Sequence, residues 1–156
     1  MSSVNNKITE ILGTKYPLIQ GGMANIGTGA FAAAVSNAGA LGLIAAGGMD
    51  TAALKKNIDE CRSLSDKPFG VNIMLMNPEA AQMAQLVIDE HIPVVTTGAG
   101  NPARFIPAWK AAGIRVLPVV PSVALGIRLE RAGVDALIVE GAESGGHIGE
   151  LTTMAL

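Results

Sequence analysis

The sequence predicts an α/β fold in which β-strands and α-helices alternate along the chain. Apolar residues make up 49% of the 156 residues and charged residues only 15%, a composition typical of a chain with a well-buried core. Short apolar segments bounded by glycine alternate with longer segments that have helical signals. The 19 glycines suit the many tight turns that such alternation needs. A chain of this length can form one core or part of a larger fold.

We expect six strands, most of which end in glycine or a small polar residue. They cover residues 18–20, 41–46, 69–75, 94–97, 115–120 and 136–139. The last strand is a near-continuous apolar run, which predicts burial on both faces, as in a parallel sheet. The third strand, FGVNIML, is interrupted by one polar residue, Asn72. A buried amide must find hydrogen-bond partners, so Asn72 either bonds a neighbouring strand or faces a polar ligand.

The segments between the strands are expected to be helical. We expect helices at residues 7–12, 29–38, 51–64, 78–90 and 102–112, a helix that Ser122 caps and that ends at Ala132, and the beginning of one more at 152–156. Asn5 or Asn6 is the candidate N-cap of the first helix, and Gly39 ends the second as a C′ residue. His91 is interpreted as a cation near a helix C-terminus, where the macrodipole favours it. Trp109 is expected to pack on a neighbouring element.

Two architectures use such repeats, the open doubly wound sheet and the (β/α)₈ barrel. The strand ends favour the barrel because they would together ring one mouth, its active face. They carry Gly21-Gly22, Gly47-Gly48, Asn72, Thr96-Thr97-Gly98 and Gly145-Gly146. We therefore predict an α/β TIM barrel forming one domain over residues 1–156, with only about the first six βα units. A full barrel takes ~250 residues, so we expect this one to be incomplete and C-terminally truncated.

Composition excludes several classes of function. The net charge of −2 and the lack of a basic run argue against nucleic acid as a partner. No apolar stretch reaches the ~18 residues of a membrane helix, and MSSVNNKITEILG has no signal-peptide core, so we expect a cytoplasmic protein. Cys61 is the single cysteine, which excludes an internal disulfide, and no Cys/His spacing predicts a metal site.

One motif offers an alternative site. Residues 27–32, GTGAFA, match the dinucleotide fingerprint G-x-G-x-x-A, and Asp50 lies beyond it as a candidate ribose ligand. However, residues 21–26 separate the fingerprint from the strand that should open directly into it. Alanine-rich helices also produce this pattern readily.

The loop after the last strand carries the strongest candidate for chemistry. It contains Glu140, Glu143, Gly145, Gly146 and His147. The two glycines permit a close approach of backbone to a ligand, and histidine is the side chain that titrates near neutral pH. The alternative is a solvated turn with an incidental histidine. A charge at Glu140 is costly to bury unless it is paired, whereas Glu143 is expected to be solvated.

A set of motifs then identifies a family. They are QGGM at 20–23, GVNIML at 70–75, TTGAGNP at 96–102, VPSVA at 120–124 and EGAESGGHIG at 140–149. Together they resemble the FMN-dependent enoyl-acyl-carrier-protein reductases of bacterial fatty-acid synthesis, within the nitronate monooxygenase (2-nitropropane dioxygenase-like) superfamily. The resemblance runs from Ile8 to Leu156. Members of the family are about twice as long as this chain.

The resemblance implies a flavin-dependent oxidoreductase with FMN at the barrel mouth and His147 as the catalytic histidine. It implies that the cofactor-binding residues are Gly22, Met23, Ala24, Asn72, Glu140, Gly145 and Gly146. NAD(P)H would be the co-substrate and an enoyl group on acyl carrier protein or CoA the substrate, with a homodimer expected. The alternatives are a nitronate monooxygenase, which uses FMN and O₂ without nicotinamide, and an inactive half-barrel.

Overall fold

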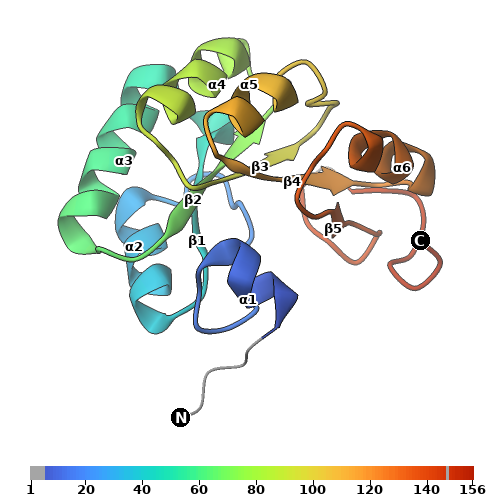
Figure 1. Cartoon of the computed structure of the whole chain (residues 1–156), viewed down its shortest axis with the longest axis horizontal. Coiled ribbons are helices and arrows are strands. Elements are labelled where there is room, and N and C mark those ends of the chain that lie inside the picture. Colours follow the sequence, from blue (N-terminus) through green and yellow to red (C-terminus); the bar gives the residue numbers. More distant parts are fainter. Residues whose placement is uncertain (1–5, 147) are drawn as a thin grey trace.

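The protein is described here by a computed structural model that covers residues 6–146 and 148–156. Its centre is a sheet of five parallel strands in the order β1-β2-β3-β4-β5 (Figure 1). The strands are β1 (Gly42–Ala45), β2 (Phe69–Met74), β3 (Val94–Gly98), β4 (Arg115–Val120) and β5 (Ile138–Val139). Each strand adds to the same edge as the one before, which is barrel topology, whereas a doubly wound sheet reverses its order. The α/β barrel fold is confirmed as an incomplete barrel, because β1 and β5 do not pair.

All the helices pack on the sheet, the first through Leu12 on its inner face and the others, which alternate with the strands, around its outside (Figure 1). They are α1 (Lys7–Leu12), α2 (Gly29–Ala38), α3 (Thr51–Leu64), α4 (Ala80–Asp89), α5 (Ile106–Ala111) and α6 (Val123–Arg131), with a 3₁₀ helix η1 (Ala46–Gly48) after β1. Of the two candidate caps of α1, the structure selects Asn6, whose Oδ1 accepts from the N–H of Ile8 and Thr9 at 3.0 Å. Gly39 ends α2 with a φ of 100°, as predicted.

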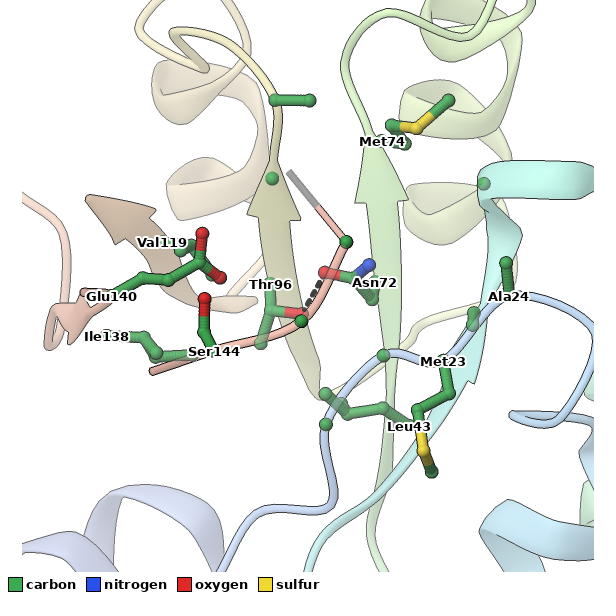
Figure 2. A pocket seen from close by; sticks show the side chains of 18 of the residues that line it. Met23, Ala24, Leu43, Asn72, Met74, Thr96, Val119, Ile138, Glu140 and Ser144 are labelled. Atoms are coloured by element: carbon green, nitrogen blue, oxygen red, sulfur yellow. Dashed lines mark hydrogen bonds between the residues drawn. The ribbon is translucent and has the colours of Figure 1, made fainter. Parts of the chain in front are cut away.

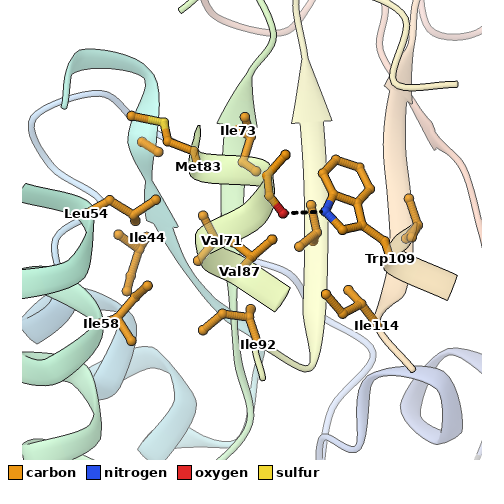
Figure 3. Close-up of a cluster of buried hydrophobic side chains, with 14 of the residues drawn as sticks. Ile44, Leu54, Ile58, Val71, Ile73, Met83, Val87, Ile92, Trp109 and Ile114 are labelled. Atoms are coloured by element: carbon orange, nitrogen blue, oxygen red, sulfur yellow. Dashed lines mark hydrogen bonds between the residues drawn. The ribbon is translucent and has the colours of Figure 1, made fainter. Parts of the chain in front are cut away.

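The main core lies between the sheet and its helices (Figure 3). It includes Ile44, Val71, Ile73 and Val95 from the strands, with Leu54, Ile58, Met83, Val87, Trp109 and Ile114 packed over them. A second, smaller cluster joins Leu12 of α1 to Leu41, Leu43, Val94 and Leu117. Successive residues of one strand point to opposite faces of the sheet. The two clusters therefore fill opposite faces of the sheet and leave its carboxyl end for the site.

Trp109 is the largest fully buried side chain, which confirms that it packs on its neighbours. Its ring stacks on Phe105 with centroids 5.3 Å apart. Its Nε1–H donates to the carbonyl oxygen of Ala84 at 3.0 Å, the bond drawn as a dashed line in Figure 3. The contact joins α5 to α4 across β3. We expect Trp109→Ala to lower the free energy of unfolding by about 3–5 kcal/mol in urea denaturation, because it leaves a cavity. Trp109→Phe should cost less, and a loss below about 1 kcal/mol for the alanine variant would show that the site collapses freely.

Three predicted elements are absent or reduced. Residues 18–20 make only an isolated parallel bridge, Ile19 to Leu41, and Leu18 is 61% exposed. Residues 136–139 were expected to form a buried strand. Only Ile138 and Val139 form a strand, which pairs with β4 alone among the described strands, and Val139 is 50% exposed. Residues 152–156 form a turn and not a helix: the N–H groups of Ala155 and Leu156 both donate to the Thr152 oxygen.

Two helices begin later than predicted. α4 begins at Ala80 and not at residue 78, and α5 begins at Ile106 and not at residue 102. In the second case, residues 102–105 form a turn closed by the Phe105 N–H on the Pro102 oxygen at 2.8 Å. His91 lies just beyond α4 as expected, with a φ of 49° and its Nδ1 2.9 Å from the Asp89 carbonyl oxygen.

Asp135 fixes the chain where it turns from α6 toward β5. Both its carboxylate oxygens accept from Lys110 Nζ at 2.7 Å, and Oδ2 also accepts from the Val116 N–H at 2.8 Å. Partial burial raises the pKa of this carboxyl, but the Lys110 and Val116 donors outweigh it, so the pKa lies below its ordinary value of 3.8. Asp135 therefore stays charged at neutral pH and holds β4 to α5.

Cys61 is buried in α3, and burial raises the pKa of its thiol to about 11. Thiolates are the reactive form of cysteine, so this side chain is an apolar core residue. No helix within the described residues is long and apolar enough to cross a membrane.

Candidate functional site

A large cavity opens at the carboxyl ends of the strands, where barrel folds place their chemistry (Figure 2). Its volume is about 760 Å³, within the range of small-molecule and cofactor sites. Its described lining consists of Ile19, Gln20, Gly21, Gly22, Met23, Ala24, Leu43, Ala45, Gly47, Asn72, Met74, Thr96, Gly98, Ala99, Val119, Ile138, Glu140, Ser144, Gly145 and Gly146. Segments far apart in sequence thus meet around one hollow, as the pattern of strand ends predicted.

The first wall is the loop that follows the Ile19 bridge. Gln20 holds this loop to the sheet, because its Oε1 accepts from the Leu43 N–H at 2.9 Å. Gly22 then passes so close to Asn72 that a Cβ at position 22 would lie 2.6 Å from the Asn72 Nδ2. Met23 begins a turn in which its carbonyl oxygen accepts from the Gly27 N–H at 2.8 Å. A side chain at position 22 would therefore displace that of Asn72.

The floor of the cavity contains a polar pair on adjacent strands. Asn72 on β2 and Thr96 on β3 are direct partners in the parallel register. The Thr96 hydroxyl donates to the Asn72 Oδ1 at 2.8 Å. Asn72 therefore has the strand-to-strand bond and also lines the cavity, while its contact with a ligand stays a prediction.

The second wall is the loop after β5. The Glu140 N–H donates to the Val120 oxygen at 3.1 Å, which places the start of the loop beside the end of β4. Glu143 is exposed, as expected, but it accepts from the N–H and the hydroxyl of Thr153, each at 2.8 Å. These two bonds lower the pKa of Glu143 below its ordinary value. The carboxylate thus ties the loop to the last residues of the chain.

Seven of the eight predicted site residues line this cavity. They are Gly22, Met23, Ala24, Asn72, Glu140, Gly145 and Gly146. The eighth, His147, lies outside the described residues. The lining brings together the three segments that carry these residues, and their roles toward a ligand stay predictions.

The cavity has mostly apolar walls, with side chains of Met23, Leu43, Val119 and Ile138 among them (Figure 2). Glu140 is the one ionisable side chain among the described lining residues. Such a surface suits a planar, largely apolar group that is oriented by a few polar contacts. The described residues contain no cluster of His, Cys, Asp or Glu that could hold a metal ion.

Gln20 and Thr96 are not among the eight site residues predicted from the sequence, although Thr96 was placed at the barrel mouth with the other strand ends. Gln20 is adjacent to the two glycines of its loop, which is a usable signal. Thr96 could have been found only from the register, since a strand pairing of Asn72 with residue 96 is what joins the two side chains.

The fingerprint at residues 27–32 serves packing. The N–H of Gly29 donates to Asn57 Oδ1 at 2.7 Å and that of Ala30 to Glu60 Oε2 at 3.3 Å, so side chains of α3 occupy the start of α2. A Cβ on Gly29 would lie 2.1 Å from the backbone carbonyl oxygen of Asn57. Asp50 caps α3 by accepting from the Ala53 N–H at 2.7 Å. The glycines therefore permit close helix packing, and a pyrophosphate has no free N–H groups at these positions.

Comparison with known proteins adds a family to this geometry. The sequence model of the nitronate monooxygenase family matches residues 5–156. Among solved structures, FabK from Thermotoga maritima is 51% identical with a TM-score of 0.96, over 99% of this chain and 50% of that one. A nitroalkane oxidase from Streptomyces ansochromogenes is 28% identical with a TM-score of 0.81, over 92% of this chain and 51% of that one.

Curated relatives carry two further names. A (3aS,4S,5R,7aS)-5-hydroxy-7a-methyl-1-oxo-octahydro-1H-indene-4-carboxyl-CoA dehydrogenase from Rhodococcus jostii is 34% identical over all of this chain and 44% of its own length. A probable nitronate monooxygenase from Staphylococcus aureus is 31% identical over 92% of this chain and 51% of its own length. The chain thus spans about half the length of the relatives it matches. The family match over nearly the whole sequence shows that the chain belongs to the nitronate monooxygenase family.

Proposed function

We propose that the chain is an FMN-binding oxidoreductase and acts as an enoyl-thioester reductase driven by NAD(P)H. The observation that carries this proposal is the cavity at the strand ends, whose shape and polar groups suit an isoalloxazine ring. The 51% identity to FabK, an enoyl-acyl-carrier-protein reductase, favours the reductase over other activities of the family.

The residues present fit a flavin in two respects. Gly22 has no Cβ, which lets the Asn72 side chain lie against its loop, and residues 22–24 border the cavity in which a flat ring would lie. Asn72 carries an amide NH₂ for which the described residues provide no hydrogen-bond acceptor. Flavin rings carry carbonyl and imine acceptors that such a donor can bind.

FMN, when bound, supplies hydride chemistry that no side chain can perform. The protein then has to orient the ring and the substrate and to handle one proton. In this proposal Asn72 donates to the ring, and the backbone of residues 22–24 borders it. Glu140, Gly145 and Gly146 form the opposite wall. His147 hydrogen-bonds the thioester oxygen of a trans-2-enoyl substrate, or delivers the proton to its α-carbon.

The partners follow from the same proposal. The enoyl group would be carried on acyl carrier protein or CoA, NAD(P)H would be the co-substrate, and the enzyme would work in the cytoplasm as a homodimer. Fatty-acid synthesis is the process that uses this reaction.

A nitronate monooxygenase is the second candidate, favoured by the family match and by the Staphylococcus aureus relatives. In that reaction His147 would act as the base that removes a proton from a carbon acid. The cofactor would again be FMN, with O₂ as the oxidant and no nicotinamide.

Two assays on the purified chain supplied with FMN separate these candidates. The reductase predicts NAD(P)H oxidation that crotonyl thioester stimulates, and no oxygen uptake with propyl nitronate. The opposite pattern would establish the monooxygenase. A purified protein that binds no FMN, so that it is colourless after unbound FMN has been removed, and that has no activity in either assay would be the inactive half-barrel.

A further inference from the structure

The cavity floor contains a buried hydroxyl whose partner is a cavity-lining amide. Thr96 is 1% exposed, and within the described chain its hydroxyl makes one hydrogen bond, to the Asn72 Oδ1 at 2.8 Å. A buried hydroxyl without an acceptor is unfavourable, so this bond matters to Thr96 as well as to Asn72.

The bond decides which end of the amide faces the cavity. The oxygen and nitrogen of an asparagine amide have nearly the same shape and differ only in accepting or donating. Because the Thr96 hydroxyl needs an acceptor, the amide oxygen lies toward β3 and the nitrogen points away from it (Figure 2). Turning the amide over would let its NH₂ donate to the Thr96 oxygen but would leave the buried hydroxyl proton without an acceptor, which disfavours that arrangement roughly tenfold.

The Asn72 Nδ2 so placed lies close to Gly22. A Cβ on Gly22 would come within 2.6 Å of the Asn72 Nδ2 and 2.7 Å of its Cγ, so the NH₂ can lie here only because residue 22 has no side chain. No described residue accepts a hydrogen bond from it. The cavity therefore presents a fixed donor.

We propose that Thr96 is a positioning residue that locks Asn72 as a hydrogen-bond donor toward the flavin. The inference rests on the proposed function. It takes the contact between Asn72 and the flavin from that proposal and adds that Asn72 is the hydrogen-bond donor in it. A donor strengthens its bond as negative charge builds on a flavin acceptor atom, so it favours the reduced over the oxidised ring. Thr96 thus influences both FMN affinity and reduction potential through its bond to Asn72.

The strand supplies a matched control. Thr97 is the next residue of β3, is equally buried at 1% exposure, and has a hydroxyl with no hydrogen-bond partner among the described residues. Its side chain points to the opposite face of the sheet. Thr97→Val is the same chemical change as Thr96→Val, one residue away and outside the cavity.

The test is an FMN titration of four proteins together with the midpoint potential of the bound flavin. Thr96→Val should weaken FMN binding roughly 5- to 10-fold and lower the midpoint potential; a tenfold loss of preference for the reduced form corresponds to about 30 mV for two electrons. Thr96→Ser keeps the hydroxyl and should restore both values. Thr97→Val should bind FMN as the unchanged chain does. Unchanged affinity and potential in Thr96→Val, or equal losses in Thr97→Val, would overturn the inference.

A second variant covers the case in which Thr96→Val does not fold. Asn72→Asp keeps an acceptor for Thr96 but presents an oxygen to the cavity, so it should weaken FMN binding at least as much; normal binding would overturn the inference. Failure of the unchanged chain to bind FMN would instead overturn the proposed function, and this inference with it. FMN binding by the unchanged chain with no effect of either variant overturns this inference alone.

Discussion

Gly22→Ala is expected to weaken FMN binding by roughly 10- to 100-fold while the protein still folds. The added Cβ would lie 2.6 Å from Nδ2, 2.7 Å from Cγ and 2.9 Å from Cβ of Asn72. All three atoms belong to one side chain, so the strain is relieved when Asn72 turns away from the loop. Turning away removes the donor from the cavity and breaks the bond from Thr96. The melting temperature should fall by only a few degrees.

Gly21→Ala is the matched comparison for this variant. Gly21 precedes Gly22 in the same loop, and a Cβ there would meet no atom within 4 Å. Neither glycine has a φ in the left-handed region, so both substitutions test space and not backbone strain. Flavin fluorescence quenching measures both affinities. Equal losses of FMN affinity at the two positions, or normal FMN binding by Gly22→Ala, would refute the idea that Gly22 makes room for the Asn72 side chain.

His147→Ala is expected to reduce turnover by about 10²- to 10⁴-fold and to leave FMN affinity within about twofold. The expectation rests on the family resemblance and on the position of this residue in sequence. It follows Gly145 and Gly146, which line the same cavity as Asn72. A group that transfers a proton contributes to the transition state and little to cofactor binding, so the two measurements should separate.

His91 supplies the control histidine. It lies beyond the end of α4, is exposed, and is absent from the described cavity lining. His91→Ala should therefore leave turnover and FMN affinity unchanged. Near-normal turnover of His147→Ala with crotonyl thioester would remove this histidine from the mechanism.

Most of the fold was predictable because its elements are specified locally. Helices α1, α2 and α3 and strand β4 have the expected bounds, since caps and glycines mark their ends within the sequence. The prediction of a buried strand at residues 136–139 was wrong, because an apolar pattern shows that a segment can be buried but not which neighbour would bury it. The burial of an edge strand depends on a neighbour, and β5 has one only on the side of β4.

The site was predictable at positions where the residue type is unusual for its place in the fold. An asparagine inside a buried strand and paired glycines at strand ends are unusual enough to indicate a ligand. The Thr96 bond was not predictable, because threonine is common in strands and its partner depends on register. The packing role of Gly29 was also not predictable, since its contact with Asn57 joins α2 to α3 through residues that are 28 positions apart in the sequence.

The most direct test of the account is an absorption titration of the purified chain with FMN. The account predicts a saturable shift of the flavin bands that ends at one FMN per chain, because the ring moves from water into the apolar cavity around Asn72. A spectrum that remains that of free FMN at every protein concentration would contradict it.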